Sequence, residues 1–302
     1  MPHKYQAVLD IGSNSVRLLV VQWDGEQALS MYQDKITTRL IFGMENGLLQ
    51  QDAIARTAEA LEQLTRKARS LGADGDVLAF GTSAMRDAQN SLSLIERCRP
   101  FLPDIRILTG DEEADLAYAG AAPAGRRGVI DIGGGSTELM GGENGVRLFA
   151  RSLNLGAVRL YEAMPGCSDP SNLRQAARSL LQGAREGVAP FLPLPWTGVG
   201  GTVTSLAALD LGLSLYDPLR VQDHPLAADF VFGSLETLCA MSPEERAIIP
   251  AIGPQRSDII PCGAAILSAF FELFEVDGLL VSDRDSLMGY LKKYAFPPDA
   301  CG

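Results

Sequence analysis

Two short segments of the sequence place an aspartate directly before a run of small residues. The first runs from Asp10 to Ser15 and the second from Asp131 to Thr137. Backbone N–H groups in such turns form a concave donor site for phosphate oxygens, and carboxylates are ligands that Mg²⁺ favours. The pattern predicts phosphate binding by Ser13, Asn14, Ser15, Gly133, Gly134, Gly135, Ser136 and Thr137, and metal binding by Asp10 and Asp131.

The two segments are parts of an internal repeat. The stretch 8–18 aligns with the stretch 129–139, sharing Val, Asp-Ile-Gly, Ser and Leu positions. Each copy is typical of a strand, a tight turn and a second strand, so the chain is expected to contain two related halves. An aspartate in one such turn could serve only as a local turn residue. Its repetition in the same context favours a functional role.

A third turn of small residues, Gly200-Gly201-Thr202, is also expected to bind phosphate. It follows an apolar strand at 196–199 and precedes a helical pattern at 203–211. Helical spacing marks 54–71, 92–98 and 173–188, and short apolar runs predict strands at 77–80 and 105–108. This mixture predicts an α/β protein. The segment 121–125 is the expected boundary between domains 1–121 and 122–302.

Two further segments carry charged groups after predicted strands. Glu112 and Glu113 begin an Ala-rich helix, where a carboxylate can orient or deprotonate water. Favourable interaction with the helix dipole is the simpler explanation of these residues taken alone. Arg86 and Arg17 follow phosphate-type turns, and a guanidinium binds phosphate through two parallel hydrogen bonds. The alternative for either arginine is an ordinary surface position.

Composition excludes several classes of protein. A net charge of −11 opposes broad nucleic-acid binding, which needs an excess of Lys and Arg. The apolar stretch 259–274 is interrupted by polar residues and predicts a buried helix, so no membrane segment is expected. The apolar run before Asp10 is too short for a signal-peptide core. Five scattered cysteines without a C-x-x-C pair fit a reducing environment, so we expect a cytoplasmic protein.

In this order, the motifs resemble the exopolyphosphatase and guanosine pentaphosphate phosphohydrolase family, a branch of the actin/hexokinase/Hsp70-like superfamily. The resemblance covers nearly the whole chain. It is carried by Asp10-Ile-Gly-Ser-Asn-Ser, Gly81-Thr82-x-Ala84-x-Arg86, Gly110-x-Glu112-Glu113-Ala114, Asp131-Ile-Gly-Gly-Gly-Ser-Thr-Glu138, Leu155-Gly156-Ala157-Val158, Gly200-Gly201-Thr202 and Arg256-x-Asp258-Ile-Ile-Pro261.

The resemblance implies two ribonuclease-H-like domains flanking a cleft, with a last helix from about residue 285 able to pack back on the first domain. It implies Mg²⁺-dependent release of terminal phosphate from polyphosphate or guanosine pentaphosphate. Glu113 corresponds to the catalytic glutamate, Glu112 to its supporting neighbour and Arg86 to the phosphate-contacting arginine. A homodimer is a further expectation. The sequence does not determine which of the two substrates is preferred. It also does not determine chain-length preference or processivity.

The segment 282–289 departs from the family pattern. Arg284 and Asp285 stand where two glycines are usual, and glycine permits backbone conformations that other residues avoid. The change is expected to reshape one wall of the cleft or to reduce activity. The change favours one alternative to the phosphohydrolase, a non-catalytic sensor of polyphosphate or of guanosine tetra- or pentaphosphate. A separate alternative, ranked last, is an ATP-dependent small-molecule kinase of the same superfamily.

Overall fold

The computed structural model describes residues 4–23, 28–73, 75, 77–121, 125–188 and 194–296. The chain divides into two compact units: unit 1 comprises Met1–Leu116 with Ser286–Gly302, and unit 2 comprises Ala117–Asp285. The division falls within helix α4 (Gly110–Ala121), shortly before the boundary expected at about residue 122. The last helix, α12 (Ser286–Tyr294), belongs to unit 1.

Unit 1 is built on a five-stranded sheet with the order β3-β2-β1-β4-β5. The first three strands are antiparallel neighbours, and β4 and β5 extend the sheet in parallel with β1. The parallel strands end at one edge, where the predicted site residues of this unit follow them. The strands are β1 (Lys4–Ile11), β2 (Ser15–Trp23), β3 (Ala28–Thr37), β4 (Leu78–Gly81) and β5 (Arg106–Ile107).

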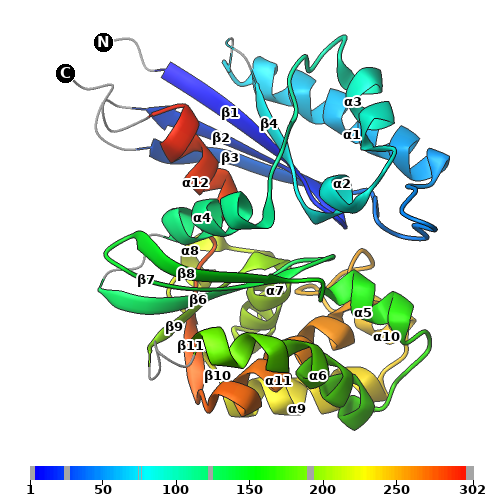
Figure 1. The fold of residues 1–302 in the computed structure, drawn as a ribbon, viewed down its shortest axis with the longest axis vertical. Coiled ribbons are helices and arrows are strands. Elements are labelled where there is room, and N and C mark those ends of the chain that lie inside the picture. The colour runs from blue at the N-terminus through cyan, green and yellow to red at the C-terminus, as the bar shows by residue number, and fades with distance from the viewer. Residues whose placement is uncertain are drawn as a thin grey trace. The chain divides into compact units, whose positions relative to one another are not determined.

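Successive side chains along β1 and β2 point to opposite faces of this sheet. Val8 and Leu19, which are cross-strand partners, pack in one apolar cluster with Leu116 of α4 and Leu287 of α12. Asp10 and its partner Arg17 lie on that same face because Asp10 is two residues after Val8 and Arg17 is two residues before Leu19. The other helices of the unit are α1 (Gln51–Ser70), α2 (Ser83–Asp87) and α3 (Ser91–Cys98) (Figure 1).

Unit 2 repeats this topology in a six-stranded sheet with the order β10-β11-β9-β6-β7-β8. Its β6, β7 and β8 are antiparallel neighbours, while β9 and β11 follow in parallel, as in unit 1, and β10 adds an antiparallel edge. The α/β class, the two related halves predicted from the repeat and the ribonuclease-H-like fold implied by the resemblance are thus confirmed. The strands are β6 (Arg126–Ile132), β7 (Thr137–Glu143), β8 (Val146–Leu153), β9 (Trp196–Val199), β10 (Pro225–Ala227) and β11 (Gly278–Val281).

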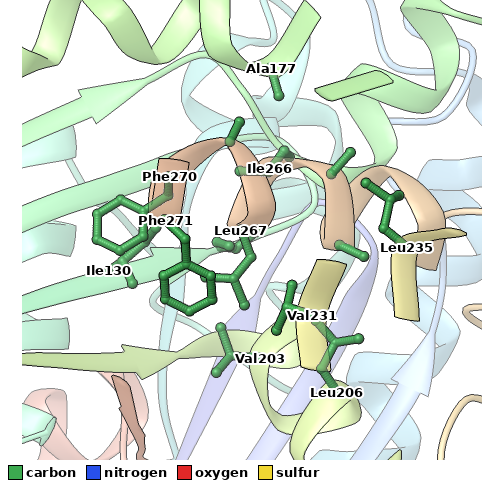
Figure 2. Packing of buried hydrophobic residues seen from close by; sticks show 14 of the residues in the cluster. Ile130, Ala177, Val203, Leu206, Val231, Leu235, Ile266, Leu267, Phe270 and Phe271 are labelled. Carbon is green, nitrogen blue, oxygen red and sulfur yellow. The ribbon is translucent and has the colours of Figure 1, made fainter. Parts of the chain in front are cut away.

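The core of unit 2 surrounds helix α11 (Ile260–Phe274). Figure 2 shows Phe270 and Phe271 of this helix beside Ile130 of β6. Phe270 is completely buried, and burial of such a side chain stabilises the fold by about 1.5–3 kcal/mol. The remaining helices are α5 (Ala157–Ala163), α6 (Pro170–Val188), α7 (Gly200–Asp210), α8 (Pro218–Val221), α9 (Ala228–Ala240) and α10 (Pro243–Ala247).

Three local details differ from the sequence-based expectation. Helix α7 begins at Gly200 rather than at Val203, so the glycine turn is itself the first turn of the helix. The strand expected at 105–108 is reduced to β5, and the short helix α2 was not expected. Among the described residues, no helix is long and apolar enough to span a membrane.

Candidate active site

The two repeated turns have the same main-chain geometry. Gly12 N donates to Ser15 O at 3.1 Å, and Gly133 N donates to Ser136 O at 2.9 Å. Each bond closes the hairpin two residues after the aspartate, which is the penultimate residue of the preceding strand. The likeness between the two sequences is therefore also a likeness in structure.

Residues that follow each hairpin in the sequence donate main-chain hydrogen bonds to the turn. In unit 1, Thr38 N donates to Asn14 O at 3.0 Å. In unit 2, Ala157 N at the start of α5 donates to Gly133 O, also at 3.0 Å. Gly156 lies so close to Gly134 that an added Cβ would stand 2.3 Å from its carbonyl oxygen. Main-chain bonds thus fix both predicted phosphate turns, as a preorganised binding loop requires.

In unit 1, Asp10 and Arg17 form an ion pair across the hairpin. Arg17 Nε lies 3.0 Å from Asp10 Oδ2, and Arg17 Nη2 lies 2.5 Å from the same oxygen. Asp10 is 3% exposed, so the guanidinium compensates a buried negative charge. The sequence analysis predicts metal binding for Asp10 and phosphate binding for Arg17, whereas the structure places the two side chains in contact.

Glu113 and Arg86 form a second ion pair in the same unit. Arg86 Nη1 lies 2.9 Å from Glu113 Oε2 and 3.1 Å from Leu108 O. Residues 82–86 follow β4 and Glu113 follows β5, so the parallel pairing of those strands brings the two side chains together. The arginine expected to contact phosphate is thus held beside the glutamate expected to act on water.

The ionisation of Glu113 is strongly affected by its surroundings. Burial raises the pKa of Glu113 to about 7, opposed by the hydrogen bond and charge of Arg86. The negative charge of Asp10 raises the pKa further, and the positive charge of Arg17 lowers it. These interactions also show that the two ion pairs belong to one cluster. A carboxyl group with a pKa near neutrality is well suited to accept a proton at physiological pH.

Glu112, although adjacent, lies in a different environment. Its carboxylate accepts a hydrogen bond from Thr109 N at 2.9 Å, and Glu112 N donates to Thr109 Oγ1 at 3.2 Å. This reciprocal pair is a capping box that starts helix α4. Hydrogen bonds from Thr109 and the ion pair with Arg106 hold the pKa of Glu112 below its usual range. The structure thus gives Glu112 a helix-capping contact, and its catalytic support stays a prediction.

The hydroxyl groups of the first turn contact neighbouring side chains of unit 1. Ser13 Oγ lies 2.8 Å from Ser83 Oγ at the start of α2, and Ser15 Oγ lies 3.4 Å from Thr37 Oγ1. Asn14 Nδ2 donates to Ser15 Oγ at 3.4 Å. The first turn and the segment after β4 are therefore brought together, as phosphate binding by both would require.

In unit 2, the second and third turns meet at Asp131. A Cβ on Gly200 would lie 2.4 Å from Asp131 Oδ1, so the carboxylate rests directly against this glycine. The parallel pairing of β6 with β9 explains the contact, because Asp131 is aligned with Val199. Two segments that are distant in the sequence thus form one edge of the sheet.

Glu138 was not among the predicted site residues, but the hairpin register places it opposite Asp131. Cross-strand partners point to the same face of a sheet. Glu138 is 1% exposed and accepts a hydrogen bond from Ser152 Oγ at 2.8 Å. In unit 1 the equivalent pair is Asp10 and Arg17, so the two repeats differ at this position: one offers a cation and the other a second carboxylate.

Arg256 is a second residue that was missed as a site residue. A Cβ on Gly201 would lie 2.1 Å from Arg256 Nη2, and Arg256 Nη1 donates to Ser205 Oγ. The guanidinium therefore lies against the third turn and adds positive charge there. The sequence signal was present in the motif Arg256-x-Asp258, to which no role was assigned.

Other residues of these turns are fixed by backbone groups. Thr137 Oγ1 donates to Leu155 O at 2.5 Å, and Arg159 Nε donates to Gly135 O at 2.9 Å. Thr202 is buried against Gly263 of α11, where a Cβ would lie 2.5 Å from its hydroxyl oxygen. These contacts position the turns and account for the small residues around them.

The close contact at Gly200 gives a testable expectation. Gly200 has φ +88°, which favours glycine, and its Cα faces Asp131. Gly200→Ala should destabilise the protein by more than the about 1–3 kcal/mol that a strained φ costs, because its Cβ meets the carboxylate. Gly212→Ala is the matched control, since φ is +60° there and the space is open. Equal losses in the free energy of unfolding would contradict the contact.

The atypical segment 282–289 has an ordinary backbone. Neither Arg284 nor Asp285 is among the described residues with positive φ, so their side chains fit without the freedom that glycine provides. Ser282 Oγ accepts from Arg284 N at 3.1 Å, which closes a tight turn. The segment therefore keeps a regular path, while the expected effect on activity stays a prediction.

Two α/β units of matching topology, each with a β-hairpin that turns at Asp-Ile-Gly, define the class of this protein. Residues 19–291 match the model of the Ppx/GppA phosphatase family. The chain belongs to this family.

Individual relatives agree with that assignment. The chain is 30% identical to exopolyphosphatase 2 of Mycobacterium tuberculosis, over 94% of this chain and 96% of the relative. It is 29% identical to guanosine-5'-triphosphate,3'-diphosphate pyrophosphatase of Aliivibrio fischeri, over 93% of this chain but only 57% of that longer protein. The crystal structure of the Aquifex aeolicus Ppx/GppA family member superposes with a TM-score of 0.80 at 28% identity, covering 97% of this chain and 98% of the other.

Proposed function

We propose that the protein hydrolyses the terminal phosphoanhydride bond of inorganic polyphosphate or guanosine pentaphosphate in a Mg²⁺-dependent reaction. The names of the relatives support these substrates. The observation that carries the proposal is the buried Glu113, whose raised pKa and contact with Arg86 suit a general base beside bound phosphate.

Glu113 accepts a proton from water in the proposed step. The water oxygen attacks the terminal phosphorus, and the bond from that phosphorus to the bridging oxygen breaks. The bridging oxygen leaves with the shortened phosphate chain, and the proton moves to Glu113. Arg86 lies at hydrogen-bond distance from Glu113, so it can orient the carboxylate while it binds a phosphate oxygen.

Phosphate binding is assigned to both repeated turns, the third turn, Arg17 and Arg86, and now also to Arg256. Backbone amides and guanidinium groups can make such a region locally positive although the whole chain carries a net charge of −11. The residues of the turns are Ser13, Asn14, Ser15, Gly133, Gly134, Gly135, Ser136, Thr137, Gly200, Gly201 and Thr202.

Residues at the end of β6 suit a Mg²⁺ ion. Asp131 and Glu138 face the same side of their hairpin and offer hard oxygen ligands. Asp10, the other predicted ligand, already accepts two hydrogen bonds from Arg17 at one oxygen. No group of three or more potential ligands occurs in the described part of the chain, which fits an ion that keeps several waters and binds substrate oxygens. Neutralisation of phosphate charge is what bound Mg²⁺ supplies.

The proposal is tested by phosphate release from guanosine pentaphosphate, inorganic polyphosphate and ATP, measured side by side with and without Mg²⁺. We expect Mg²⁺-dependent release from at least one of the first two substrates. Tight binding without release over hours would instead favour the sensor, and phosphate transfer from ATP to an acceptor would favour the kinase. The cytoplasmic location, the homodimer and the lack of nucleic-acid binding stay predictions.

A further inference from the structure

Exposed apolar residues lie in the segment after α7 and at the start of α8. Leu215 is 82% exposed, Tyr216 is 44% exposed, and Leu219 is 87% exposed. We call these three residues the apolar platform. Single exposed apolar residues are common on proteins, but these three stand within five positions of one short segment.

The platform is joined to the third phosphate turn through Tyr216. The Tyr216 hydroxyl donates to Asp283 Oδ1 and also interacts with the side chain of Thr204. Thr204 Oγ1 in turn donates to Gly200 O at 3.1 Å. The hydroxyl end of the tyrosine is therefore anchored at the turn, while part of its ring remains open to solvent.

Positive charge lies close to the same tyrosine. The charge of Arg256 acts on the Tyr216 phenol, and Arg256 itself rests against Gly201. The anion-binding groups of unit 2 thus stand next to an aromatic and aliphatic surface. Inorganic polyphosphate carries only charged and polar oxygens on phosphorus, so it has no apolar group that could pack against that surface.

We propose that the apolar platform binds the base of a nucleoside polyphosphate whose phosphates lie at residues 200–202 and Arg256. A planar base stacks on the exposed ring of Tyr216 and covers Leu215 or Leu219, while the charged end of the same molecule meets the guanidinium. The inference rests on the proposed function and narrows it, because it assigns this surface to the nucleotide rather than to the inorganic substrate.

The test compares Tyr216→Ala with Tyr216→Phe on two substrates, guanosine pentaphosphate and inorganic tripolyphosphate. Tyr216→Ala should lower kcat/KM for the nucleotide about 10-fold, the size expected for loss of one stacked base, and leave kcat/KM for tripolyphosphate unchanged. Tyr216→Phe should retain both values because it keeps the ring. Leu219→Ser, at an exposed position that the fold does not need, should also weaken only the nucleotide reaction.

Equal losses on both substrates with Tyr216→Ala would overturn the inference, since the tyrosine would then act only by supporting the turn through Thr204. Loss with Tyr216→Phe would overturn it too, because the hydroxyl rather than the ring would be needed. A lower oligomeric state in Leu219→Ser would assign the platform to a second copy of the chain. If the native protein releases no phosphate, the proposed function fails separately, and calorimetric titration of each variant with guanosine pentaphosphate still decides whether Tyr216 binds the base.

Discussion

Glu113→Gln should lower kcat for phosphate release by about 10²- to 10⁴-fold, the range that a general base contributes. The amide has nearly the same shape and can still accept the hydrogen bond from Arg86, but it cannot take a proton from water. Substrate binding should persist because the phosphate-binding turns and Arg86 are unchanged. The measurement is kcat from initial rates, together with calorimetric titration of the substrate.

A matched control is available two residues earlier in the same helix. Asp111 is an exposed carboxylate in the first turn of α4, so Asp111→Asn removes the same charge at an exposed position. It should retain native kcat. Undiminished phosphate release by Glu113→Gln would remove Glu113 from the mechanism, whereas weaker binding with unchanged kcat would make it a binding residue.

Asp131→Asn should lower the rate of phosphate release by about 100-fold or more at a Mg²⁺ concentration that saturates the native protein. The carboxylate is half-buried, stands opposite Glu138 and rests against Gly200, so the amide keeps the shape but loses a hard charged ligand. The Mg²⁺ concentration for half-maximal rate should rise about 10-fold or more.

A titration of the rate with Mg²⁺ measures both effects. Asp217→Asn is the control, because Asp217 caps α8 through Leu219 N at 3.0 Å and asparagine caps helices equally well. The control should titrate like the native protein. An unchanged Mg²⁺ requirement in Asp131→Asn would show that the ion is held elsewhere.

Much of the fold was predictable because the repeat determines it. Once 8–18 and 129–139 are interpreted as equivalent hairpins, the two halves and the place of Asp10 and Asp131 at strand ends follow. The strand Trp196–Val199 was predicted to the residue, since a compact apolar run ends abruptly at glycine. The start of α7 at Gly200 was not predictable from propensity, because glycine disfavours helices and only packing against Asp131 and Arg256 explains it.

The candidate site was predictable in part. The register of each hairpin follows from its short turn, and it pairs Asp10 with Arg17 and Asp131 with Glu138. These two side-chain pairs were therefore predictable from the sequence. The pattern Thr109-x-x-Glu112 is a capping-box signature, so the sequence already indicates a helix-capping contact for Glu112 and not for Glu113. The burial of Glu113 and its contact with Arg86 depend on the pairing of β4 with β5, which the sequence does not specify.

The central claim is that Glu113 acts as the base with a pKa close to neutrality. The most direct test is the pH dependence of kcat/KM for phosphate release, which reports groups of the free protein. Since the base must be deprotonated, the rate should rise with pH, reach half of its plateau at about pH 7 and level off above it. A rate that is independent of pH between about 5 and 9, or that falls as pH rises through 7, would contradict the account.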